Sequence, residues 1–141
     1  LAVLVVLQFF QVEWQKDGDA SLAIENEFPM PEDVKNILQK SCLDCHSNKV
    51  NVMWYQHLQP LAWWIEHHVE EGREELNFSE FLAYTPKRQD HKLEEVVEML
   101  EDNVMPLESY TYMHADAILT DVEKEKLYTW VKQCRAQIVL P

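Results

Sequence analysis

The feature that most constrains this chain is the segment Ser-Cys-Leu-Asp-Cys-His-Ser-Asn at residues 41–48. Cys42 and Cys45 are separated by two residues, and His46 follows directly. Two thiols and one imidazole at this spacing can form a redox-active dithiol, contribute to a metal site or attach a prosthetic group. The sequence around the segment discriminates between these three uses.

The surrounding sequence favours attachment of a prosthetic group. A thioredoxin-like dithiol needs a βαβ context, and no stretch of this chain alternates as a strand does. A zinc site needs four ligands, and no second Cys/His pair occurs at zinc-knuckle spacing. Cys-x-x-Cys-His is the attachment signature of c-type haem. We therefore predict one covalently attached haem c, with Cys42 and Cys45 as thioether sites and His46 as the proximal iron ligand.

The second axial ligand of the iron is predicted from the remaining methionines and histidines. Met105 stands at the exit of a predicted helix, directly before Pro106, where a stiff turn can project its thioether. Met105 is therefore the predicted distal ligand, and His114, in a segment predicted to be irregular, is the imidazole alternative. Arg73 is a candidate donor to the haem propionates. No catalytic residue is predicted.

Hydrophobic periodicity predicts an all-α bundle of four to five helices around the haem. The longer helices are expected at about residues 31–41, 60–71, 86–105 and 120–134. Gly72 is expected to stop the second helix, and Asn77 to cap a short one after it. Residues 120–123, Thr-Asp-Val-Glu, form a capping box for the last helix. Cys134 shares an apolar face of that helix and is expected to be buried.

The net charge and the glycine content exclude several functions. The chain carries 25 acidic and 12 basic residues, a formal net charge of -13, so binding to a nucleic-acid backbone is not expected. Only two glycines occur, which excludes the Gly-rich nucleotide-binding loops. An acidic surface favours a partner with a basic docking face, such as a redox protein or a membrane respiratory or photosynthetic complex.

The N-terminal residues are strongly apolar. Residues 1–10 contain a single polar side chain, Gln8, and Trp14 follows as a candidate interfacial residue. We predict an incomplete membrane-anchor helix at residues 1–14, a linker at 15–28 and a haem-binding domain at 29–141. A short buried core segment is the alternative for the apolar stretch. The anchor would place the domain on the periplasmic side of a bacterial inner membrane.

Several longer motifs add a family resemblance. The segments CLDCHSN, MWYQHLQP, WWIEHHVEEGREELNFSEF, MPLESYTYMHADAILT and YTW cover roughly residues 29–132. In these segments the chain resembles the haem-binding domain family, which are small membrane-anchored bacterial monohaem c-type cytochromes. The resemblance implies a helical cytochrome c fold outside the inner membrane, tethered by an N-terminal helix. It also implies thioethers at Cys42 and Cys45, proximal ligation by His46 and distal ligation by Met105.

These features together predict a one-electron carrier and not an enzyme. Two filled axial positions suit electron transfer, whereas a haem enzyme or gas sensor leaves the distal position open. That second class is the main alternative function. A structural haem subunit of a larger membrane complex is the third.

Overall fold

The computed structural model describes residues 1–15 and 19–140, which contain seven α-helices, four 3₁₀ helices and no strand. The α-helices are α1 (Ala2–Leu7), α2 (Glu32–Ser41), α3 (Leu43–His46), α4 (Leu61–Glu75), α5 (Pro86–Glu101), α6 (Glu108–Thr111) and α7 (Asp121–Gln137). The 3₁₀ helices are Ile24–Asn26, Trp54–His57, Phe81–Ala83 and Ala115–Ala117. The all-α prediction is confirmed. The predicted bundle of four to five helices is wrong, because α3 and α6 are too short to show a periodic pattern, and the predicted N-terminal helix is present only as the short α1.

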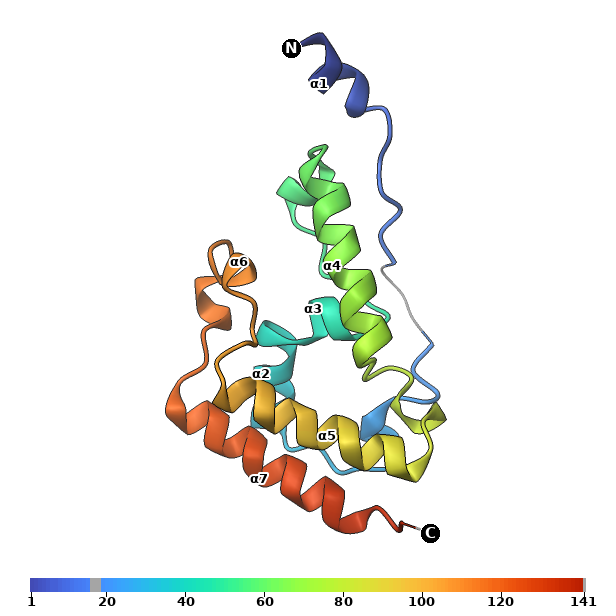
Figure 1. Ribbon diagram of the computed structural model, residues 1–141, viewed down its shortest axis with the longest axis vertical. Coiled ribbons are helices and arrows are strands. Elements are labelled where there is room, and N and C mark those ends of the chain that lie inside the picture. The colour runs from blue at the N-terminus through green and yellow to red at the C-terminus, as the bar shows by residue number, and fades with distance from the viewer. Residues whose placement is uncertain (16–18, 141) are drawn as a thin grey trace.

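The long helices α4, α5 and α7 form the frame of the molecule. Figure 1 shows α5 and α7 side by side, with α4 rising from the level of α5 and α3 lying between α2 and α4. Apolar side chains from these helices and from the segments between them pack into one core. Its largest fully buried members are Trp130, Phe81, Ile24, Leu38, Leu93, Leu127, Val131 and Cys134. The prediction that Cys134 is a buried apolar residue is confirmed.

The start of α7 is the capping box expected from the sequence. Thr120 Oγ1 accepts a hydrogen bond from the Glu123 backbone N–H at 3.3 Å, and Glu123 Oε2 accepts one from the Thr120 N–H at 2.9 Å. The other carboxylate oxygen of Glu123 lies 2.7 Å from Lys40 Nζ at the end of α2. One carboxylate therefore both caps α7 and ties it to the helix that leads into Cys42.

This double role makes the stability depend on pH. The Lys40 ammonium, followed by the Thr120 N–H, lowers the pKa of Glu123 from 4.5 to about 2. Because the folded-state pKa lies below the unfolded one, the stabilisation is complete above about pH 5 and disappears as the pH falls towards 2. We expect Glu123→Gln to lower the free energy of unfolding by about 1–2 kcal/mol at pH 7, after allowing for solvent screening of the pair. Urea denaturation at pH 7 and pH 3 should show this difference shrinking at the lower pH.

Glu125→Gln is the matched control, because Glu125 is an exposed carboxylate on the same helix. It should change the free energy of unfolding by less than about 0.5 kcal/mol at both pH values. Equal effects of the two substitutions, or a Glu123 effect that does not shrink with pH, would contradict the assignment.

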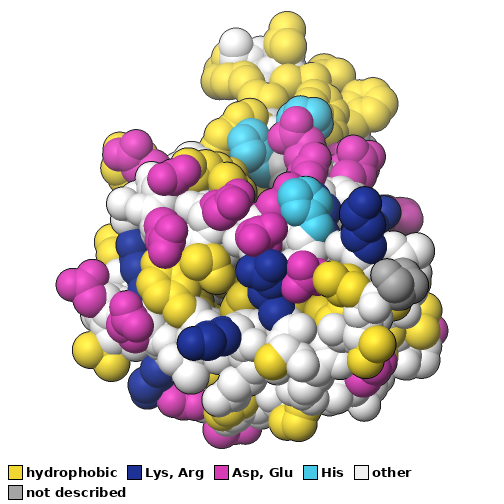
Figure 2. All heavy atoms as spheres, turned by 60° about the horizontal axis from the view of Figure 1, so that its bottom comes forward, with side chains coloured by type: hydrophobic (Ala, Val, Ile, Leu, Met, Phe, Trp, Pro, Cys, Tyr) yellow, Lys and Arg dark blue, Asp and Glu magenta, His cyan; other side chains and the backbone are white. Residues whose placement is uncertain are grey.

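The membrane-anchor helix predicted at residues 1–14 is wrong, because within these residues only α1, of six residues, is helical. Across residues 1–15 and 19–140, no helix combines the length and apolarity needed to cross a membrane. The periplasmic inner-membrane location inferred from the anchor is therefore also not supported. Figure 2 shows hydrophobic side chains gathered at the end of the molecule that carries the N-terminus, with acidic ones spread over the rest of this face.

Residues predicted to form the linker make contacts with the core. Ile24 and Phe28 are each 2% exposed, and the Ile24 N–H donates to the Phe78 carbonyl at 3.0 Å. The Leu82 N–H donates in turn to the Leu22 carbonyl at 2.9 Å. Residues 16–18 of the predicted linker, and Pro141 at the end of the predicted domain, lie outside the described residues.

Candidate cofactor site

Two adjoining cavities lie where α2 meets α3, between α4, α5 and the turn at Met105. The smaller, of about 270 Å³, is lined by all four residues predicted from the sequence: Cys42, Cys45, His46 and Met105. The larger, of about 350 Å³, shares three of these residues and lies against apolar side chains of the core. Those apolar side chains include Leu38, Leu76, Phe78, Val96, Leu100 and Leu127. The fold therefore brings a methionine from the second half of the chain to the Cys-x-x-Cys-His motif.

Residues Leu43–His46 of the motif form α3, a single helical turn of four residues, and Cys42 lies between α2 and α3. A turn of this length is not stable alone, so its conformation depends on its neighbours. His46 Nδ1 lies 2.9 Å from the Leu76 carbonyl oxygen at the end of α4. Because a carbonyl oxygen only accepts, Nδ1 carries the proton and Nε2 is the ring atom with a free lone pair. This is the arrangement that an iron-ligating histidine needs.

The two thiols of the motif are protonated at neutral pH. Burial raises the pKa of Cys42 to about 12, and the neighbouring Cys45 adds to the shift. Burial and the Asp44 carboxylate raise the pKa of Cys45 to about 11, although Arg73 partly opposes this. A reactive dithiol depends on a thiolate, which this environment does not favour. Across the described residues, no group of three or more His, Cys, Asp or Glu side chains is placed to hold a metal ion.

Gly72 of α4 lies directly against Cys45 of the motif. A Cβ added there would lie 2.8 Å from the Cys45 carbonyl oxygen and 3.1 Å from the Cys45 Cβ. The prediction that Gly72 stops the helix is wrong, because α4 continues to Glu75. The glycine instead permits α4 to pack directly on the backbone of α3.

This contact reverses the usual effect of a helical glycine substitution. Gly→Ala inside a helix normally stabilises by up to about 1 kcal/mol. We expect Gly72→Ala to destabilise by about 1–3 kcal/mol, because the added methyl group meets backbone atoms that cannot rotate away. Urea denaturation of the haem-loaded protein measures the change. Glu70→Ala, on an exposed position of α4, is the control and should have an effect close to zero; stabilisation by Gly72→Ala would contradict the close packing.

Met105 lies in the turn that follows α5. The backbone N–H groups of Val104 and Met105 both donate to the Met99 carbonyl, at 3.0 and 3.2 Å, and Asn103 adopts a left-handed conformation with φ of 56°. The turn places the half-buried Met105 side chain on the wall of both cavities. Met99 lines only the larger one. His68, from α4, is a further imidazole on the smaller one.

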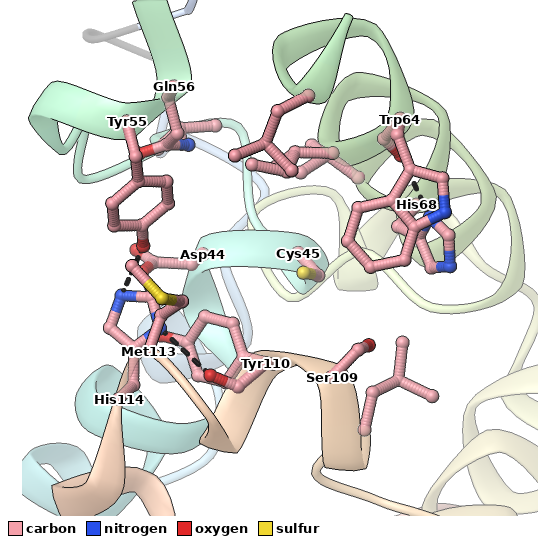
Figure 3. A pocket seen from close by; sticks show the side chains of 15 residues that line it. Asp44, Cys45, Tyr55, Gln56, Trp64, His68, Ser109, Tyr110, Met113 and His114 are labelled. Carbon is pink, nitrogen blue, oxygen red and sulfur yellow. Dashed lines mark hydrogen bonds between the residues drawn. The ribbon is translucent and has the colours of Figure 1, made fainter. Parts of the chain in front are cut away.

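His114, the alternative ligand, lines a third pocket, which adjoins the smaller cavity and shares Asp44, Cys45 and Tyr110 with it. Figure 3 shows its ring between Tyr55 and Tyr110. His114 Nδ1 lies 3.1 Å from the Tyr110 carbonyl oxygen, Nε2 lies 2.9 Å from the Tyr55 hydroxyl, and the ring stacks on Tyr110. Both ring nitrogens therefore have hydrogen-bond partners, and His114 lines neither of the cavities beside His46. The Tyr110 hydroxyl donates to Asp44 at 2.8 Å, so this network supports the motif from outside.

Charged residues line the cavities where α4 and α5 face each other. Lys92 Nζ lies 3.1 Å from Glu75 and 2.6 Å from Glu95, and all three line the larger cavity. Arg73, the predicted propionate donor, lines neither cavity; its Nε donates to the Ser47 carbonyl at 2.8 Å. Sequence reasoning missed Lys92, because its helix position shows only that it is polar.

The residues around these cavities fit a haem. The walls combine apolar core side chains with two thiols, an imidazole whose Nδ1 is already hydrogen-bonded, and a thioether. Thiols, imidazole and thioether are the groups by which proteins attach haem c and ligate its iron.

Comparison with known proteins agrees with this assignment. A family model described as haem-binding domain matches residues 2–133. No curated protein and no solved structure matches the chain. The matched range covers nearly the whole chain, including the residues predicted to be anchor and linker. The chain belongs to the haem-binding domain family.

Proposed function

We propose that this protein is a one-electron carrier with one covalently attached haem c. The observation that carries the proposal is the convergence of Cys42, Cys45, His46 and Met105 on one cavity. Cys45 and His46 belong to the single helical turn α3 and Cys42 directly precedes it, whereas Met105 lies in a separate turn after α5. A solely structural cavity would not require two thiols, an imidazole and a thioether together.

Each residue has a defined role in this proposal. Cys42 and Cys45 would each add their S–H across one vinyl group of the haem, giving two thioether bonds without an oxidant. His46 would bind the iron through Nε2, oriented by the Leu76 carbonyl, and Met105 would supply the second axial ligand. The bound haem would supply a reversible change between ferric and ferrous iron. Ligation by methionine and histidine favours a higher reduction potential than ligation by two histidines.

The charges near the cavities support a basic redox partner. Glu71, Glu75 and Glu95 line the cavities against Lys92, within a chain of net charge -13. Electron transfer to a basic partner protein should therefore slow as ionic strength rises, because screening weakens the attraction. A rate independent of salt would count against electrostatic docking. The proposal includes no catalytic residue.

The first test is a visible spectrum of the protein matured with haem, oxidised and reduced, with and without carbon monoxide. A reduced c-type spectrum that carbon monoxide does not alter is expected, because both axial positions would be filled. Rapid binding of carbon monoxide would favour an open distal site, as in a haem enzyme or gas sensor, over the carrier. Absence of covalent haem would refute the attachment.

A further inference from the structure

The residues directly after the motif are bound to the segment that follows α4. We call residues 46–48 and 76–80 together the ligand clamp, because hydrogen bonds join the two runs side by side. The Phe78 N–H donates to the His46 carbonyl at 2.8 Å, and His46 Nδ1 donates to the Leu76 carbonyl at 2.9 Å. His46 is therefore held by its backbone and by its ring to the same short segment.

Two asparagine side chains form hydrogen bonds that join the two runs of the clamp. Asn48 Oδ1 accepts from Asn77 Nδ2 at 2.7 Å, and Asn48 Nδ2 donates to Glu80 Oε1 at 2.8 Å. The Asn48 N–H donates to Ser79 Oγ at 3.1 Å. Asn77 also shapes its own segment, since its Oδ1 accepts from the Ser79 N–H at 3.0 Å and its N–H donates to the Tyr84 hydroxyl. Asn77 thus forms a turn and does not cap a helix, contrary to the sequence-based prediction.

Burial increases the importance of these contacts. Asn48 is 9% and Asn77 is 5% exposed, so each buried amide would be costly without its partner. The helix they hold, α3, is only one turn long and cannot fix the direction of His46 by itself. Arg73 Nε also donates a hydrogen bond to the carbonyl of Ser47, which lies in the first run of the clamp. The geometry of the His46 ring therefore depends on residues about thirty positions away in sequence.

We propose that Asn48 and Asn77 are positioning residues for the proximal ligand, and this inference rests on the proposed haem attachment. Their amide pair holds the Leu76 carbonyl against His46 Nδ1. A strong hydrogen bond at Nδ1 raises the basicity of the imidazole, which stabilises ferric iron relative to ferrous. Loosening the clamp weakens that bond and raises the midpoint potential of the haem.

The test compares Asn77→Ser and Asn48→Ala with Gln89→Ala in the haem-loaded protein. Asn77→Ser removes the amide donor to Asn48 but keeps an oxygen that can accept from Ser79. Gln89 is a buried amide outside the clamp, with its Nε2 donating to the Phe81 carbonyl, and its substitution reports the general cost of losing such a group. All three changes leave the net charge unaltered, so the potential is not shifted by charge itself.

Two readouts separate positioning from simple packing. We expect both asparagine variants to raise the midpoint potential and to speed exchange of the Phe78 N–H about tenfold. Gln89→Ala should lower stability without either effect. If the asparagine variants keep the parental potential and Phe78 protection, the clamp does not position His46. A wild-type chain without covalent haem would instead refute the proposed attachment, so the two failures are distinguishable.

Discussion

Cys42→Ser combined with Cys45→Ser is expected to abolish covalent haem attachment completely. Serine preserves the size of each side chain but cannot form a thioether to a vinyl carbon. The effect is all or none, because no other cysteine lines the cavities. The third cysteine, Cys134 of α7, is buried in the hydrophobic core and is 1% exposed. Mass spectrometry of the denatured protein should lose the mass of one haem, and the haem stain of a denaturing gel should disappear.

Cys134→Ser is the matched control for this experiment. This substitution also replaces a cysteine sulfur by an oxygen, yet the denatured protein should keep the full mass of one haem. A buried hydroxyl in the core should lower the stability, so the covalent haem content is expressed relative to the amount of folded protein. Covalent haem in the double variant, or loss of attachment in Cys134→Ser alone, would contradict the assignment of Cys42 and Cys45.

The second large effect is expected from Met105→Ala. This change removes the thioether from the cavity wall and opens the sixth position of the iron. Carbon monoxide should then bind the reduced protein rapidly, whereas it leaves the parent spectrum unchanged. The midpoint potential should fall, because methionine ligation favours the ferrous form. Carbon monoxide titration and potentiometry measure the two effects.

Three further variants make this prediction specific. Met99 and His68 also line parts of the two cavities, whereas Met113 lines only the adjoining pocket with His114. Met99→Ala, His68→Ala and Met113→Ala should each keep a spectrum that carbon monoxide does not change. If His68→Ala or Met99→Ala allows carbon monoxide to bind the iron and Met105→Ala does not, the distal ligand is His68 or Met99, respectively, and not Met105.

Local sequence patterns predicted much of the secondary structure. The capping box at Thr120, the proline start of α5 and the apolar stripe that buries Cys134 all appear in the structure. These features depend on residues within one or two turns of each other, so the sequence encodes them directly. The short helices α3 and α6 and the continuation of α4 through Gly72 were missed because they depend on contacts from distant segments. The apolar run at residues 1–10 was misjudged for a different reason, since composition does not give helix length.

The sequence by itself determined the chemistry of the candidate site, because Cys-x-x-Cys-His carries its donor groups within five residues. It could also nominate Met105, from the proline that follows. Only the tertiary structure decided which candidates meet: it lines one cavity with Met105 and the motif, and it engages both nitrogens of His114 elsewhere. Only the tertiary structure, too, revealed Gly72 against Cys45 and the clamp around His46. The physical reason is that a donor atom is a property of one residue, whereas its direction is set by packing between residues far apart in the chain.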